Sequence, residues 1–210
     1  MASWVAAVVQ GVVVVLVGAL LGSVFGVVGA VVGAVISLPF ALAYAIGVGR
    51  GCPYADGRRG ARRCLVDATW SGLNTWAGAV YYGAHRFRRN TLEPERSRGT
   101  GALWLTNGFT PKYATTIGTV KAGSNDRRDR HEQVHVLQAR LFGPFYLPLI
   151  GLNYVVATVV PYWLLFRGAS RRKPITGFRS YFEDGVYPNT WHELWAYKVT
   201  RVPHPTPTPP

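Results

Sequence analysis

Charge is absent from the first 49 residues of this 210-residue chain, and every Lys, Arg, Asp and Glu lies from Arg50 onward. A cleaved signal peptide does not fit this segment, because no basic region precedes the apolar run and the run is too long. One membrane crossing needs about 20 apolar residues. Residues 4–49 therefore predict two transmembrane helices joined by a turn, for which Gly26 to Gly33 or Ser37-Leu38-Pro39 are the candidates.

Cysteine is also scarce, since Cys52 and Cys64 are the only two and their spacing is not CxxC. Two cysteines alone cannot form a structural zinc site. They could pair in an oxidising compartment, or remain free thiols in the cytoplasm. The chain also lacks a GxSxG elbow, a phosphate-binding Gly-Lys loop and a dinucleotide fingerprint, and these absences argue against three common classes of enzyme.

The formal charge of +13 lies entirely outside the apolar N-terminus. Next to a membrane segment, anionic lipid headgroups are the simplest partner for this charge. Nucleic acid is not expected, because no RRM, helix-turn-helix or zinc-finger pattern accompanies it. Arg50, Arg58, Arg59, Arg62 and Arg63 follow the apolar run, and the positive-inside rule puts their loop in the cytoplasm. We expect an integral membrane protein of the bacterial inner membrane, with its soluble portion on the cytoplasmic side.

Glycine recurs every four residues at Gly18, Gly22 and Gly26. Such spacing makes a flat stripe along which another helix can approach closely. Packing within one hairpin is one interpretation of the stripe. The other is a glycine zipper that forms a homo-oligomer or a pore.

Four regions are expected in an α+β, mostly helical fold. We expect one amphipathic helix over 65–86 with its aromatic rings at the lipid headgroups, two or three short strands over 102–122, and helices over 126–142 and 188–200. Val134, Leu137 and Leu141 should form the buried stripe of the helix over 126–142. The regions are 1–50 (glycine-rich transmembrane hairpin), 51–101 (basic and aromatic interfacial segment), 102–200 (metallopeptidase-like domain) and 201–210 (Pro-rich disordered tail).

Residues 142–166 form a second charge-free stretch, long enough to span a membrane. Pro144, Pro148 and Pro161 interrupt it, so a re-entrant or interfacial segment competes with a true crossing. If one metal ion has ligands both before and after this stretch, those ligands must lie on the same side of the membrane. Such a site therefore requires that residues 142–166 do not simply cross it.

The sequence His131-Glu132-Gln133-Val134-His135 is the sharpest chemical signal in the chain. Residues four apart share one face of a helix, so His131 and His135 can both bind one metal ion. Glu132 is displaced by about a hundred degrees and can take a proton from a metal-bound water. Random placement of five His and five Glu would give roughly 0.003 such matches. The pattern therefore predicts a zinc site, although two histidines on a solvated or lipid-facing helix remain the alternative.

A third protein ligand is required, and Glu193 is the best candidate. It lies on the helix expected over 188–200, where Glu-x-x-Ala ends in the small residue Ala196, which allows close helix packing. His192 is an adjacent competitor. Gln138, one turn beyond His135, could bond to a ligand imidazole or to substrate, or could equally cap an exposed face of the helix. Tyr197 could stabilise an oxyanion.

The stretch from His131 to Arg140, the Gly-Pro-Phe-Tyr-Leu-Pro segment over 143–148 and the Trp-His-Glu-Leu-Trp-Ala segment over 191–196 together resemble a group of bacterial membrane-associated HExxH, gluzincin-like zinc metallopeptidase-like proteins. The resemblance covers about residues 115–200. It implies a metallopeptidase-like fold with His131, His135 and Glu193 as zinc ligands and Glu132 as base. Val134 departs from the pattern, which usually has Gly there, and it crowds the face where substrate would lie.

These observations together predict a membrane-bound zinc hydrolase, of the peptidase type, that acts on a peptide or protein substrate. The alternative from another class is an oligomerising or pore-forming glycine-zipper protein with a structural or vestigial metal site. A basic membrane-surface adaptor without metal is a third reading, in which His131→Ala would be silent.

Overall fold

The computed structural model describes residues 3–55, 57–109, 114–123, 126–166 and 175–201. Contacts divide the chain into two units, residues 1–144 and residues 145–210. The described residues are mostly helical and include one three-stranded sheet, in agreement with the expected α+β, mostly helical class. The first unit contains the apolar hairpin, the sheet and the HExxH helix, and the second contains Glu193.

The apolar N-terminus forms a helical hairpin, as expected. Helix α1 covers Ser3–Gly22, a 3-10 turn η1 covers Ser23–Phe25, and α2 covers Gly26–Gly51. The turn therefore lies before both candidate positions. Gly26 opens α2 with a φ of 78° and a ψ of −167°, a conformation that is essentially restricted to glycine.

Glycines of the two hairpin helices lie against each other. A Cβ on Gly22 would lie 2.1 Å from the Gly29 carbonyl oxygen, and one on Gly18 would lie 2.7 Å from the Gly33 carbonyl oxygen. The contact is thus backbone against backbone, within one chain. Gly26, which we expected in the same stripe, lies in the turn, and a Cβ there would meet nothing within 4 Å.

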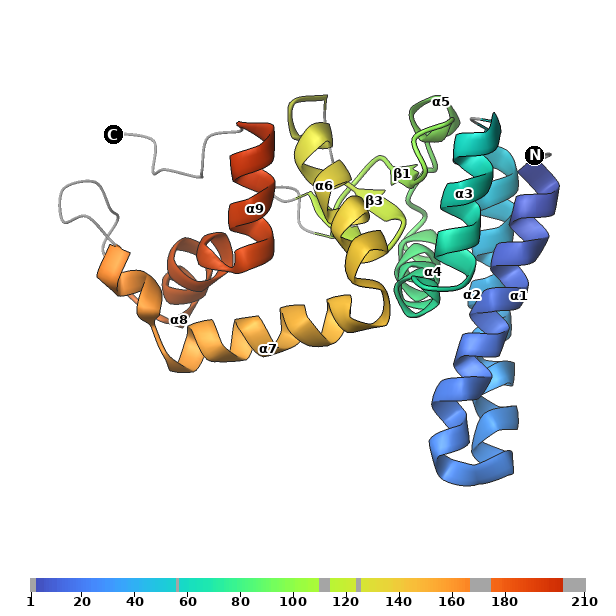
Figure 1. Ribbon diagram of the computed structural model, residues 1–210, viewed down its shortest axis with the longest axis horizontal. Coiled ribbons are helices and arrows are strands. Elements are labelled where there is room, and N and C mark those ends of the chain that lie inside the picture. The colour runs from blue at the N-terminus through green and yellow to red at the C-terminus, as the bar shows by residue number, and fades with distance from the viewer. Residues whose placement is uncertain (1–2, 56, 110–113, 124–125, 167–174, 202–210) are drawn as a thin grey trace. The chain divides into compact units, whose positions relative to one another are not determined.

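The half of the hairpin nearest its turn is exposed, and extends away from α4 and the sheet (Figure 1). Leu20, Phe25 and Val27 are 69%, 84% and 82% exposed. The other half packs on helix α4. Two helical stretches of the described chain, Ser3–Gly51 and Arg128–Val159, are long and apolar enough to cross a membrane.

The segment expected as one amphipathic helix over 65–86 is two helices. Helix α3 covers Gly57–Ala68 and α4 covers Gly72–Phe87, with a turn over 69–71 between them. The aromatic rings of this segment are only partly at the surface, because Trp70 is 48% exposed whereas Tyr81 and Tyr82 are 7% and 3% exposed and belong to the main core. This core also contains α1, α2 and strand residues, so the two tyrosine rings serve packing within the unit.

Three short strands follow the helix α5 (Pro94–Ser97), as predicted for 102–122. They are β1 (Leu103–Leu105), β2 (Thr115–Ile117) and β3 (Val120–Ala122), in the order β1-β3-β2. Strand β3 is parallel to β1 and antiparallel to β2. Gly118, in the turn between β2 and β3, has a φ of 56°, and a Cβ there would lie 2.0 Å from the Asn74 carbonyl oxygen.

Helix α6 covers Asp126–Phe142, and its C-terminus matches the predicted one. Its buried stripe differs from the predicted one, because Leu137 and Leu141 are 56% and 57% exposed although Val134 is buried. His135 and Gln138 are among the residues of the buried face instead.

The second unit is a series of short helices around Ala157, Trp163 and Val186. Helix α7 has 14 residues, about 21 Å at 1.5 Å per residue, and is therefore shorter than the hydrocarbon core of about 30 Å. Of the predicted Pro-rich tail, only Arg201 is described. The elements are η2 (Gly143–Phe145, at the boundary), α7 (Tyr146–Val159), η3 (Tyr162–Phe166), α8 (Phe178–Ser180), η4 (Tyr181–Val186, a π-helical turn), η5 (Tyr187–Asn189) and α9 (Trp191–Thr200).

Both cysteines are free thiols in the structure. Cys64 is buried beside Gln10, whose amide donates to the Cys64 carbonyl oxygen at 2.9 Å and to its sulfur at 3.3 Å. The side-chain amide nitrogen of Gln10 in the apolar helix α1 thus bonds to α3, which links the hairpin to the rest of its unit.

Candidate metal centre

His131 and His135 direct one ring nitrogen each at the same point. They lie one turn apart on α6, and their Nε2 atoms are 3.1 Å apart. Two imidazole nitrogens on one tetrahedral zinc, each at about 2.05 Å, would lie roughly 3.3 Å apart. Both residues are buried, at 5% and 6% exposure. The helix therefore presents two nitrogen donors already at the spacing that a metal ion requires.

Gln138 orients one of these rings. Its Oε1 lies 2.9 Å from Nδ1 of His135, and the side chain is completely buried. With Oε1 as the acceptor, the proton of His135 is on Nδ1 and the lone pair of Nε2 faces His131. Gln138 thus favours the tautomer of His135 whose Nε2 could bind a metal ion.

The side chain of Glu132 is fixed by the sheet. Thr116 of β2 donates its hydroxyl to Oε2 of Glu132 at 2.6 Å, and Glu132 is 5% exposed. Glu132 therefore lies between the two histidines in the sequence, but its carboxylate is held by a residue of the sheet, outside α6. Thr116 was not singled out from the sequence, where it is one of several Thr in a strand-like run.

Lys121 fixes the first turns of α6 to β3. Its Nζ lies 2.6 Å from Oδ1 of Asp129 and 3.0 Å from Oε1 of Gln133, and 4.2 Å from the centre of the Trp104 ring. Burial lowers the pKa of the Lys121 ammonium group, and the neighbouring Asp129 carboxylate acts in the opposite direction. A Lys between Val120 and Ala122 in a short strand was the signal that could have revealed this contact.

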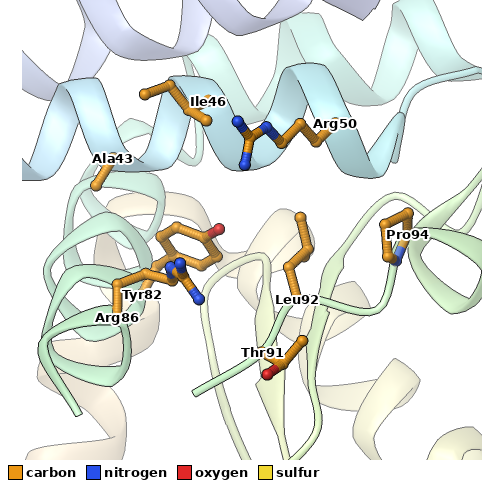
Figure 2. Close-up of a pocket in the computed structure, with 8 residues that line it drawn as sticks. All are labelled: Ala43, Ile46, Arg50, Tyr82, Arg86, Thr91, Leu92 and Pro94. Carbon is orange, nitrogen blue, oxygen red and sulfur yellow. The ribbon is translucent and has the colours of Figure 1, made fainter. Parts of the chain in front are cut away.

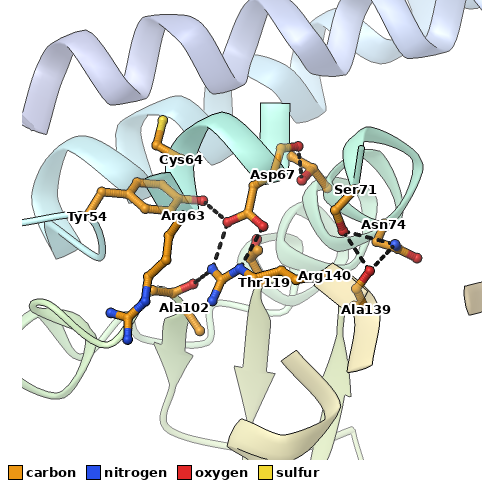
Figure 3. Close-up of polar contacts among 12 residues, drawn as sticks. Tyr54, Arg63, Cys64, Asp67, Ser71, Asn74, Ala102, Thr119, Ala139 and Arg140 are labelled. Carbon is orange, nitrogen blue, oxygen red and sulfur yellow. Dashed lines mark hydrogen bonds and ion pairs between the residues drawn. The ribbon is translucent and has the colours of Figure 1, made fainter. Parts of the chain in front are cut away.

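The C-terminal end of α6 is held by the turn between α3 and α4 (Figure 3). Ser71 donates to the Ala139 carbonyl oxygen at 3.0 Å, and Asn74 donates to the carbonyl oxygens of Ala139 and Gly143 at 3.1 and 2.7 Å. The last carbonyl groups of a helix have no partner within it, so these donors replace the missing bonds. This explains why the expected single helix over 65–86 is interrupted at the turn.

Glu193 lies in the first turn of α9 in the second unit, and is 3% exposed. Its neighbour His192 is also buried, with Nε2 3.4 Å from the Tyr154 hydroxyl and 3.8 Å from Oε1 of Glu193. Ala196 is completely buried, and Tyr197, one turn beyond Glu193, is half-buried. Sequence reasoning named Glu193 and His192 as competitors, and both are buried polar side chains on α9.

His131 and His135 of the first unit and Glu193 of the second are all buried, and each offers one possible ligand atom. The group could hold a metal ion. Two imidazoles and one carboxylate are a common donor set of catalytic zinc, and imidazole also suits copper, iron and nickel. The geometry therefore supports a metal centre, without selecting the metal.

No protein-family model matches this chain, and no curated protein or solved structure matches it either. The chemistry of the site therefore follows from its own donor atoms and their surroundings.

Proposed function

We propose that this chain is a membrane-anchored zinc-dependent hydrolase of the peptidase type. The observation that carries the proposal is the pair of Nε2 atoms of His131 and His135, 3.1 Å apart, beside the restrained carboxylate of Glu132. The hairpin α1–α2 supplies the membrane anchor. The sequence resemblance to HExxH metallopeptidase-like proteins supports the same activity.

In this proposal His131, His135 and Glu193 hold the metal ion. The histidines belong to the first unit and Glu193 to the second, so the proposal includes the assembly of the two units around the ion. Bound zinc would act as a Lewis acid on a substrate carbonyl and make water more acidic. The two imidazoles are neutral and the Glu193 carboxylate carries one negative charge. A doubly charged metal ion bound by these three ligands would therefore keep a net positive charge.

Glu132 would act as general base. Glu132 follows His131 in sequence and is displaced around the helix by about a hundred degrees, so its carboxylate can accept a proton without occupying the metal. The hydrogen bond from Thr116 occupies Oε2, and leaves Oε1 for this proton transfer. Tyr197 remains the proposed oxyanion donor. The substrate class is a peptide or protein near the membrane surface.

The glycine-zipper alternative has less support. Gly18 and Gly22 contact Gly33 and Gly29 of the same hairpin, so a second chain would have to displace an existing contact. We therefore propose no pore or oligomer through these glycines.

Metal content tests the proposal. Detergent-purified protein, loaded with zinc and dialysed, should contain about one zinc ion per chain by elemental analysis. His135→Ala and Glu193→Ala should both lose it, whereas Glu132→Gln should keep the zinc and lose hydrolysis of an unstructured protein substrate. His192→Ala is the matched control for Glu193, because it changes an adjacent buried residue on the same helix.

Two results would contradict parts of this proposal. A wild-type protein that binds no metal, even with excess zinc supplied, would remove the metal centre and the hydrolase with it. Zinc retained in Glu193→Ala but lost in His192→Ala would keep the centre and move its third ligand to His192.

A further inference from the structure

A cavity of about 440 Å³ lies between α2, α4 and the segment that follows α4 (Figure 2). Tyr82 and Leu92 lie on the α4 side of it, opposite Ala43 and Ile46 of α2. Gly47 of α2 brings the two helices close here, because a Cβ at this position would lie 2.7 Å from the Tyr82 ring. The cavity is wholly within the first unit and separate from the candidate metal centre. Its lining residues are Ala43, Ile46, Arg50, Tyr82, Arg86, Thr91, Leu92 and Pro94.

Two guanidinium groups face this cavity without an acidic partner. Arg50 comes from the last turn of α2 and Arg86 from the last turn of α4, and both are exposed. Arg86 donates to the Asn90 carbonyl oxygen, which carries no full charge. No Asp or Glu lines the cavity, and within the described chain neither arginine forms an ion pair. The cavity therefore carries two uncompensated positive charges, which suits an anion with several oxygen acceptors, such as phosphate.

An apolar ridge runs along α2 to the same place. Leu38, Leu42 and Ile46 follow one another at intervals of four residues, and the next residue in this series is Arg50. They are 52%, 65% and 37% exposed. From Leu38 to Arg50 the helix rises about 18 Å, compared with about 15 Å for one leaflet of a hydrocarbon core. The ridge has the length of an acyl chain in one leaflet, with the arginine at its polar end.

We propose that this cavity binds the phosphate headgroup of an acidic phospholipid, whose acyl chain lies along Leu38, Leu42 and Ile46. Arg50 and Arg86 bind the phosphate oxygens, and the Tyr82 ring forms the apolar floor beneath it. The proposal rests on the membrane anchoring proposed above, but not on the metal centre. Arg50 is the first charged residue of the chain, so in a bilayer it lies at the depth of the headgroups.

Thermal stabilisation by short-chain lipids tests this proposal. Wild-type protein in neutral detergent is titrated with dioctanoyl phosphatidylglycerol, with dioctanoyl phosphatidylcholine, and with glycerol phosphate as the free head. Only the phosphatidylglycerol should raise the melting temperature in a saturable manner. In the double variant Arg50→Gln/Arg86→Gln, the dissociation constant for phosphatidylglycerol should rise roughly thirtyfold. In Ala43→Phe, which fills the cavity and keeps both arginines, binding should be lost as well.

Arg58→Gln/Arg62→Gln is the matched control, because it removes the same charge from exposed positions of α3 outside the cavity. Equal weakening in this control would overturn the site, since net charge alone would then explain binding. Equal stabilisation by glycerol phosphate would overturn the lipid assignment in favour of a soluble phosphate ligand. Two further measurements are made on the same samples. Zinc content reports on the metal centre, and carbonate-resistant membrane association reports on the anchor, so a failure of either is distinguished from a failure of the lipid site.

Discussion

The guanidinium of Arg140 binds the carboxylate of Asp67 through two parallel hydrogen bonds, from Nε to Oδ1 at 2.8 Å and from Nη2 to Oδ2 at 2.7 Å. Tyr54 donates a third bond to Oδ2 at 2.8 Å, and Asp67 is completely buried. Arg140 lies five residues beyond His135 on α6, and Asp67 lies on α3. This pair thus connects the helix of the candidate ligands to the helix that follows the hairpin.

Removal of one partner of this pair should destabilise the first unit. We expect Asp67→Asn to lower the free energy of unfolding by about 3–5 kcal/mol, because Arg140 is left as an unpaired buried charge. Asp67→Asn/Arg140→Gln should recover part of this loss. A double-mutant cycle by denaturant unfolding in detergent measures the coupling, and strictly additive effects would contradict a direct interaction.

Gln138→Leu should weaken metal binding without preventing folding. The change removes the acceptor that holds His135 in its ligating tautomer, and loss of such a contact typically costs 10- to 100-fold in metal affinity. Gln138→Glu retains an acceptor and should bind metal much better than the Leu variant. Competition against a chromophoric chelator gives the affinities, and equal values for Leu and wild type would exclude this role of Gln138.

Thr116→Val should reduce hydrolysis with no loss of metal. The valine has nearly the same shape but cannot donate to Glu132, so the carboxylate loses its orientation. Since a positioned general base contributes about 10²- to 10⁴-fold, a tenfold to hundredfold fall in kcat is expected. Thr116→Ser should restore most of it. Zinc lost together with activity would indicate instead that Thr116 supports the fold of the site.

Gly22→Ala should disrupt the hairpin, because its Cβ would meet the backbone of Gly29 rather than a side chain that can move. We expect a destabilisation of about 1–3 kcal/mol, as for other overpacked sites. Gly151→Ala, inside α7 with open space around it, should be neutral or stabilising by roughly 0.5–1 kcal/mol. Limited proteolysis in detergent compares the two variants, and an intact hairpin in Gly22→Ala would contradict the close contact.

His85 should make stability depend on pH. The residue is 2% exposed, and Nδ2 of Asn90 lies 2.7 Å from its Nδ1. Burial lowers the pKa of His85 in the folded protein below 6.5, and Arg88 lowers it further. The unfolded chain therefore binds this proton first, and the free energy of unfolding falls as the pH drops below about 6.5.

The measurement is the difference between wild type and His85→Gln, since the other histidines titrate in both. This difference should change by at most about 1.4 kcal/mol per pH unit below pH 6.5 and be flat above it. If the free energies of unfolding of the two proteins run parallel across pH 5 to 7, His85 binds its proton as well in the folded state as in the unfolded chain, which would contradict the prediction.

The sequence predicted those features that depend on local pattern. A chain without charge over residues 4–49 has few alternatives to a helical hairpin, and His131 and His135 share a face of any helix. The three strands and the helices around positions 131 and 193 were also correctly located. These predictions need only neighbours in sequence, for which periodicity and spacing are sufficient.

Features that depend on distant partners were missed. At the turn over 69–71, Ser71 and Asn74 donate to carbonyl groups of Ala139 in α6 and of Gly143 just after it, 65 to 69 residues away. Leu137 and Leu141 were expected inside from helix periodicity, yet both leucines are exposed, and the buried face of α6 combines polar side chains such as His135 and Gln138 with Val134, Val136 and Ala139. Because polar side chains share this buried face, hydrophobic periodicity alone could not define it.

The hairpin turn over Ser23–Phe25 has a consequence for biosynthesis. Those three residues and their neighbours carry no charge, and neither does any other residue before Arg50. If both helices enter the bilayer together, only this uncharged loop has to cross it, and no ionised group has to leave water. Because the backbone carbonyl and amide groups are hydrogen-bonded within each helix, α1 and α2 can insert together as a preformed hairpin. Such a hairpin could enter a bilayer without an energy source that drives translocation of a soluble domain.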